Sequence, residues 1–186
     1  MINHGSPKRV PKPLDSARLE ELALAYVARF ATSRAKLEGY LLRKLRERGW
    51  AGEGEPPVGA LAERFEAAGY VDDTAYARAK SGSLLRRGYG VRRVSQALDA
   101  AGIDQAVRAG LRPGEGAQRR AALALARKRR FGPFGAQPLD RAQRERQVAA
   151  MLRAGHPLDK ARELVDAPSV EAAEDWSLAS DGTGDD

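Results

Sequence analysis

The sequence of 186 residues contains no cysteine, which excludes disulfide bonds and thiolate metal sites. Aromatic residues make up only 6% of the chain, so aliphatic side chains must supply most of any core. No apolar run approaches the roughly 20 residues that a membrane helix needs, and the first residues lack the apolar stretch of a signal peptide. We therefore expect a cytoplasmic protein with no membrane contact.

Residues from which catalytic sites are built are scarce as well. The chain has two histidines, His4 and His156, without evident partners, and it has no lysine motif of a phosphate-binding loop. Gly88-Tyr89-Gly90 lacks the third glycine and the preceding strand of a dinucleotide-binding motif. Asp72 and Asp73 could be read as a metal-binding pair, but adjacent carboxylates at a helix start more often cap the helix. We expect no enzymatic activity, no metal and no cofactor.

Charge is abundant and unevenly placed. Lysine and arginine outnumber aspartate and glutamate by 32 to 25, a net charge of +7. From Ser169 onward every charged residue is acidic, whereas residues 1–17 are basic and rich in proline. We expect residues 1–17 to be a disordered basic arm and residues 168–186 a disordered acidic tail. The body between them is basic enough to bind a polyanion or an acidic protein surface, although a merely solubilising surface is the alternative.

Hydrophobic periodicity predicts an all-α protein. Val91, Val94, Leu98 and Ala101 recur at helical spacing, and no comparable segment alternates with period two. Side chains that can cap helices precede several predicted helices, namely Thr32, Ser33, Asp73, Asp104 and Asp159. Glycines that tolerate a left-handed conformation follow three of them, at Gly49, Gly69 and Gly102.

A diverged repeat organises these helices. The first helix of each unit carries a small-residue and arginine pattern, as in Ala75-Tyr76-Ala77-Arg78, and the second ends in Leu or Met followed four residues later by Gly. We expect three tandem three-helix repeats over residues 18–71, 72–112 and 113–167, stacked into an elongated, bent array.

Basic residues that could contact a partner form a cluster in each repeat. In the middle repeat they surround a glycine-hinged turn with one tyrosine, a pattern that suits phosphate contact and stacking, although solvated helix faces are an equal alternative. The candidate partner-binding or DNA-binding residues are Arg43, Lys44 and Arg46, then Arg86, Arg87, Tyr89, Arg92 and Arg93, then Arg127, Lys128, Arg129 and Arg130. For the neighbouring Phe131 and Phe134 we expect core packing.

The middle repeat carries a family resemblance. Gly69-Tyr70-Val71-Asp72-Asp73, Tyr76-Ala77, the segment Arg86 to Gly90, and Gly102-Ile103 after Leu98 together resemble the RecX family of regulators of the RecA recombinase. The resemblance extends over about residues 18–167. The chain departs from the family pattern at a Gly/Glu/Pro-rich insertion, Ala51 to Pro57, and at Ala154-Gly155-His156, where a basic residue, glycine and phenylalanine are more usual.

The resemblance implies three tandem three-helix repeats and a protein that lies in the groove of the RecA filament on single-stranded DNA. From there it would inhibit ATP hydrolysis, strand exchange and stimulated repressor cleavage, and so act in recombination, DNA repair and control of the SOS response. It also leaves direct contact with single-stranded DNA open. We expect a monomer, because no dimerisation segment is evident.

Two other classes of function compete with this interpretation. A three-helix unit with a basic helix also describes helix-turn-helix DNA-binding proteins, although the helices lack a clear set of side chains for reading base edges. A small enzyme would need an activity that depends on Asp72 or Asp73.

Overall fold

The computed structural model describes residues 12–136 and 138–179. Within these ranges the regular elements are ten α-helices and one short 3-10 helix, and the β-type pairing is a single isolated bridge between Leu14 and Trp50. The prediction of an all-α protein is confirmed. The chain divides into two compact units, Met1–Asp73 and Thr74–Asp186.

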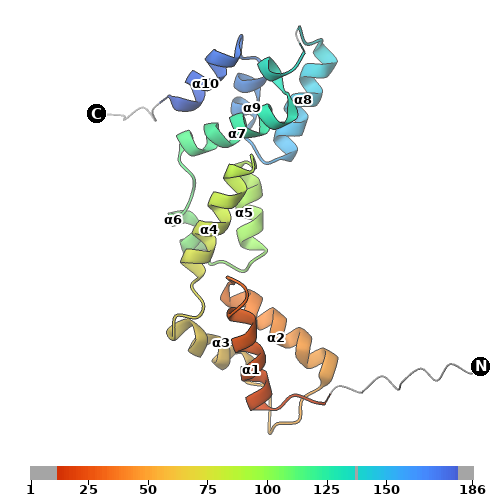
Figure 1. Ribbon diagram of the computed structural model, residues 1–186, viewed down its shortest axis with the longest axis vertical. Helices are drawn as coiled ribbons and strands as arrows, with labels where there is room; N and C mark the ends of the chain where they lie inside the picture. The colour runs from red at the N-terminus through yellow and green to blue at the C-terminus, as the bar shows by residue number, and fades with distance from the viewer. Residues whose placement is uncertain (1–11, 137, 180–186) are drawn as a thin grey trace, which may run out of the picture. The chain divides into compact units, whose positions relative to one another are not determined.

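The first unit is a three-helix bundle built on aliphatic stripes. Its helices are α1 (Ser16–Val27), α2 (Arg34–Arg48) and α3 (Val58–Ala67), and α2 packs against both of the others (Figure 1). Leu37, Leu41 and Leu45 recur every four residues along α2 and are buried, as helical periodicity predicts, whereas Leu42 lies off this stripe and is exposed. The core consists of Leu14, Leu19, Ala23, Leu37, Leu41, Leu45, Val58, Leu61, Ala62, Phe65 and Val71.

The start of this unit corrects the prediction of a disordered arm. Leu14 is fully buried, its backbone N–H donates to the Gly49 oxygen at 2.9 Å, and its own oxygen accepts from Ala51 N–H at 2.8 Å. Asp15 then caps α1 by accepting from Arg18 N–H at 2.9 Å. The prediction was therefore wrong for residues 12–17, because one apolar side chain reaches the core. Residues 1–11 lie outside the described residues.

The second unit begins with the helices of the middle predicted repeat, α4 (Asp73–Arg86), α5 (Val91–Asp99) and α6 (Gln105–Gly110). A small core joins them, formed by Ala77, Leu84, Val94, Leu98, Ala101 and Ile103. The six-residue α6 buries none of its side chains, in contrast to the third helices of the flanking repeats. The middle core is thus closed mainly by α4 and α5.

The rest of the second unit comprises α7 (Glu115–Arg129), the 3-10 helix η1 (Gly132–Phe134), α8 (Arg141–Arg153), α9 (Leu158–Val165) and α10 (Val170–Leu178). Its core centres on the small residues of α7 with Val148, Met151, Leu164 and Val165. Phe131 and Phe134 are partly buried against this core, which confirms the expectation of core packing. Among the described residues the three buried clusters correspond to the three predicted repeats, except that Leu14 in the first cluster and Ala173 in the third lie outside the predicted bounds.

Helix α10 corrects the predicted disordered tail. Ser169 caps it, and it packs on α7 with Ala173 and Ser177 buried (Figure 1). The Trp176 indole N–H donates to a Glu163 carboxylate oxygen at 2.6 Å. The acidic residues of this segment, which suggested disorder, instead complement the basic helix α7. The Arg127 guanidinium of α7 pairs with the Glu174 carboxylate of α10. The prediction was wrong for residues 170–178, and residues 180–186 lie outside the described residues.

Helix ends follow the predicted chemistry with two exceptions. Asp159 was predicted to cap a helix but lies inside α9, whose N-cap is Pro157 without a side-chain cap. Gly49, Gly69 and Gly102 have φ values of 81°, 76° and 68°, as predicted for residues that end a helix. Asp73, however, is the first residue of α4 and caps a different helix: its carboxylate accepts from the backbone N–H of Arg34, the first residue of α2, at 2.8 Å. Burial raises the pKa of this carboxyl, and the hydrogen bond from Arg34 opposes that rise.

Candidate interaction surface

The glycine-hinged turn of the middle repeat is a tight packing seam. A Cβ atom on Gly88 would lie 2.8 Å from the backbone nitrogen of Leu125 in α7, and one on Gly90 would lie 2.3 Å from the carbonyl carbon of Gly155. Backbone hydrogen bonds cross the same seam, since Gly90 N–H donates to the Ala154 oxygen at 2.9 Å. The glycines are therefore needed for close contact between the middle repeat and α7 and α8, which explains them without a bound ligand.

His156 completes this seam. Its side chain is fully buried, and its Nε2 lies 3.0 Å from the carbonyl oxygen of Gly88. A carbonyl can only accept, so Nε2 carries the proton in the neutral ring. Burial lowers the pKa of His156, and the hydrogen bond to Gly88 opposes that shift. The histidine therefore has a structural role.

Beside this seam a pocket of about 300 Å³ collects cations from three helices. Arg87 and Tyr89 come from the end of α4 and the following turn, Lys128 and Arg129 from the last turn of α7, and Arg153 from the last turn of α8. Among the described residues no acidic side chain lines this pocket. The Arg87 guanidinium lies 5.3 Å from the centre of the Tyr89 ring, within cation–π range. We call these five residues the basic pocket.

The basic pocket brings Arg87 and Tyr89 of the second predicted cluster together with Lys128 and Arg129 of the third. Arg153, which belongs to no predicted cluster, completes it. Helix C-termini carry partial negative charge, and basic residues in the last turn of α7 and α8 offset it. The excess of positive charge then faces the pocket. Such an arrangement suits phosphate groups or carboxylates, with Tyr89 available as an aromatic neighbour.

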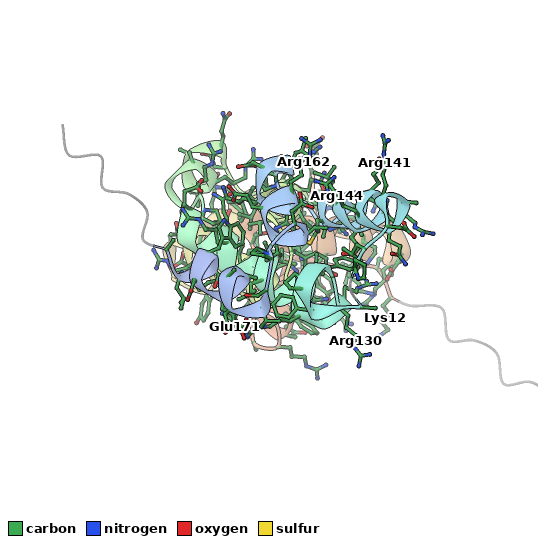
Figure 2. All side chains as sticks on the ribbon, turned by 90° about the horizontal axis from the view of Figure 1, so that it is seen from above. Lys12, Arg130, Arg141, Arg144, Arg162 and Glu171 are labelled. Atoms are coloured by element: carbon green, nitrogen blue, oxygen red, sulfur yellow. The ribbon has the colours of Figure 1, made fainter. Side chains whose placement is uncertain are left out.

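The other predicted residues of the second unit are placed differently. Arg127 is engaged by Glu174 and by the Phe134 ring, whose centre lies 5.7 Å from its guanidinium carbon. Arg130 ends α7 in a left-handed conformation with φ 57°. In Figure 2 it lies at the opposite edge from Arg141 and Arg162. Arg86 and Arg93 are exposed and line neither pocket described here.

Arg92 lines a second and larger cavity, a groove of about 570 Å³ between α5 and α6. Two arginines that sequence reasoning missed, Arg108 and Arg112, lie along the same groove. The guanidinium of Arg108 pairs with Asp99 at 3.0 Å, and its Nε is buried without a hydrogen-bond partner. None of the α6 side chains is fully buried, although Val107 packs partly buried against the core of the middle repeat.

The residues predicted in the first repeat belong to the other compact unit. Lys44 pairs with Glu47 at 2.6 Å and Arg43 lies 3.8 Å from the same carboxylate, while Arg46 is exposed. The hydrogen bond from Lys44 lowers the pKa of Glu47, so this carboxylate stays charged and offsets part of the cluster.

Arg153 is the member of the basic pocket that sequence reasoning missed. It stands two residues before Gly155, in the last turn of α8. Its signal in the sequence was the basic residue expected at a helix C-terminus.

The described residues contain no group of three or more histidine, cysteine, aspartate or glutamate side chains that could hold a metal ion. Across the described ranges, none of the helices has the length and apolar character to cross a membrane.

Comparison with known proteins identifies the family. No family model matches the sequence. The regulatory protein RecX of Myxococcus xanthus is 34% identical over 169 residues, which cover 86% of this chain and 90% of that protein. The chain belongs to the RecX family. Among solved structures, RecX from Lactobacillus salivarius matches with a TM-score of 0.62 at 15% identity, over 88% of this chain and 97% of that one. This second likeness concerns the fold, and it confirms the architecture of a RecX protein.

Proposed function

We propose that this RecX protein binds the RecA filament on single-stranded DNA and inhibits its ATPase, strand-exchange and coprotease activities. It would do so in the cytoplasm, as a monomer, without a cofactor and without chemistry of its own. Family membership and the basic pocket support this proposal. A regulator without catalytic groups must act by occupying a surface, and the described residues offer a concentrated positive surface for that purpose.

The observation that carries the proposal is the convergence of Arg87, Lys128, Arg129 and Arg153 on one pocket. Because separate helices hold these cations close together, their positive electrostatic potentials add at the mouth of the pocket. A DNA phosphate or an acidic side chain of a filament subunit could bind there. Repetition of such weak contacts along a filament would raise the overall affinity through effective concentration.

The test is ATP hydrolysis by RecA on single-stranded DNA, titrated with substoichiometric RecX protein and repeated with excess DNA. Inhibition that excess DNA does not relieve indicates direct action on the filament. Inhibition that excess DNA fully relieves indicates a general nucleic-acid binder and favours the helix-turn-helix alternative. Absence of inhibition contradicts the proposal.

The double variant Arg87→Glu/Lys128→Glu isolates the basic pocket. We expect weaker inhibition and a smaller dependence on salt concentration, because screened charge contacts are lost. Arg141→Glu/Arg162→Glu is the matched control, since it changes the net charge equally at two exposed arginines of α8 and α9 that do not line the pocket (Figure 2). Equal inhibition by the two double variants would exclude the pocket from the mechanism.

A further inference from the structure

Three aromatic rings lie in a row in the first unit. Tyr26, near the end of α1, stacks on Tyr40 of α2 with ring centres 4.2 Å apart and planes 13° apart. Phe30, in the loop after α1, contacts the Tyr26 ring at 5.4 Å. A turn fixes Phe30 at this end of the row, because its backbone N–H donates to the Tyr26 oxygen at 3.1 Å. We call Phe30, Tyr26 and Tyr40 the aromatic row.

Core packing accounts for only part of the aromatic row. Tyr26 and Tyr40 are partly buried against the core of the first unit. Such a half-buried position suits tyrosine, because its ring is apolar and its hydroxyl group is polar. Phe30 has no polar group, yet 57% of its surface is exposed. An aromatic ring that is ordered against another ring but left largely in solvent offers a free face for stacking.

Cations flank the other end of the row. Arg43 and Lys44 follow Tyr40 by three and four residues, so both project from the same face of α2. The Arg43 guanidinium carbon lies 5.4 Å and the Lys44 nitrogen 6.0 Å from the centre of the Tyr40 ring. Rings for stacking and cations for phosphate are therefore adjacent on one surface, which is the combination that binds single-stranded nucleic acid without sequence preference.

We propose that the aromatic row, with Arg43 and Lys44, is a binding site for single-stranded nucleic acid, in which a base stacks on Phe30 and phosphates bind the two cations. This site and the basic pocket have no residue in common. The proposal does not depend on whether the protein regulates RecA, because it concerns binding of nucleic acid in the absence of RecA.

Glu47 controls access to the two cations. Its carboxylate is 2.6 Å from the Lys44 nitrogen and 3.8 Å from the Arg43 Nε, and its own pKa is lowered by the hydrogen bond from Lys44. A phosphate that binds here must compete with this carboxylate. Glu47→Gln would remove the competing charge and free both cations, so it should strengthen binding if the site is real and leave it unchanged if the pairs serve only the helix.

The experiment measures fluorescence anisotropy of labelled oligothymidylate of about 15 nucleotides, alongside an abasic strand of equal length, without RecA present. Phe30→Ala should weaken binding of oligothymidylate by about fivefold or more and leave binding of the abasic strand unchanged, because only stacking is lost. Phe30→Trp should retain binding. Glu47→Gln should tighten binding of both strands, since its effect is on phosphate.

Leu42→Ala is the matched control. Leu42 is an exposed apolar residue of α2, 47% accessible, that is not part of the aromatic row. Circular dichroism verifies that each variant stays helical. Unchanged oligothymidylate affinity in Phe30→Ala overturns the proposal, and so does an equal loss for the two strands, which would show that the ring supports the fold and does not stack on bases. An unaffected Glu47→Gln overturns the phosphate part.

Discussion

The imidazole Nε2 of His156 donates to the carbonyl oxygen of Gly88 across 3.0 Å, and this bond joins residues 68 positions apart in the chain. It connects the turn after α8 with the turn before α5, where Gly155 and Gly90 also meet. The Nδ1 of the same ring is buried without a partner. A neutral histidine therefore holds two of the three helical clusters of this RecX protein together.

Acid should loosen this seam. Burial lowers the pKa of His156 in the folded protein, while the unfolded chain keeps a value of about 6.5. The unfolded state then binds more protons, so the free energy of unfolding should fall as pH decreases below about 6.5 and level off below the lowered native pKa. Urea denaturation followed at several pH values between about 7 and 5 measures this dependence.

His156→Phe tests the origin of that slope. Phenylalanine has an aromatic ring that cannot be protonated, so this variant should lose the part of the pH dependence that His156 causes, whatever its stability at pH 7. His4 serves as the control, because it is the other histidine in the sequence and His4→Phe should retain the slope. The same slope in His156→Phe and in the unmodified protein would contradict this prediction.

A side chain at Gly90 should disrupt the seam directly. The added Cβ of Gly90→Ala would lie 2.3 Å from the carbonyl carbon of Gly155, and backbone on both sides leaves little room to adjust. We expect a loss of about 1–3 kcal/mol in the free energy of unfolding, measured with urea. Gly39→Ala in the middle of α2 is the opposite case, since nothing outside the adjacent backbone of its own helix lies within 4 Å of its added Cβ. That variant should gain about 0.5–1 kcal/mol, and a loss as large as that of Gly90→Ala would refute the steric argument.

Arg130 is one of the predicted partner-binding residues, and its backbone is strained. Its φ of 57° places it in the left-handed region, where a residue with a Cβ is disfavoured by about 1–2 kcal/mol relative to glycine. Arg130→Gly should therefore raise the thermal midpoint. Arg129→Gly, in the last helical turn, should lower it. If Arg130 contacts the filament, Arg130→Gly inhibits the RecA ATPase less while being more stable, and this combination separates binding from folding. A lower thermal midpoint for Arg130→Gly would show that the cap is not strained.

Lys160 is buried on α9, and its nitrogen lies 2.7 Å from the carboxylate of Glu115 at the start of α7. The hydrogen bond from Lys160 lowers the pKa of Glu115. This contribution to stability is therefore present above the ordinary glutamate pKa and is lost as pH falls through the lowered value. Because Glu115 itself is half exposed, we expect Glu115→Gln to cost only about 1 kcal/mol at neutral pH.

Thermal unfolding of Glu115→Gln measures that cost, with Glu145→Gln as the control. Glu145 pairs with Arg141, which is 92% exposed, across one turn of α8, and exposed pairs of this kind contribute about 0.3–0.5 kcal/mol. The two variants should differ, and their difference should shrink at acidic pH. An equal effect at all pH values would mean that the burial of Lys160 does not matter.

Local features of the chain were predictable from sequence. Leu37, Leu41 and Leu45 of α2 are buried at their helical spacing, and Ser33 caps that helix. Gly49, Gly69 and Gly102 have the positive φ expected after a helix. Family membership followed from the motif around Asp72 and Asp73 and is confirmed by comparison. These features depend on neighbours within about four residues, where helical geometry leaves few alternatives.

Errors arose where distant residues supply the partner. Asp73 was expected to cap its own helix, but its carboxylate accepts from Arg34 N–H, 39 residues earlier. The acidic segment after Ser169 was expected to be disordered, but α10 finds its partners on α7 and at Glu163. Composition indicates how unfavourable it is to order such a segment, but it does not show which surface of the protein provides the contacts that offset this entropy loss.

The sequence alone determined the helical class, the family and the residues that could carry positive charge. Only the tertiary structure decided how those charges are used: Arg87, Lys128, Arg129 and Arg153 meet in one pocket, Arg127 is engaged by Glu174, and Arg43 and Lys44 share Glu47. The physical reason is the distance along the chain over which each property is set. Helix formation depends on neighbours within a period of 3.6 residues. The electrostatic field at a binding surface depends on which helices pack together, and close contacts such as that of Gly90 with Gly155 decide that packing.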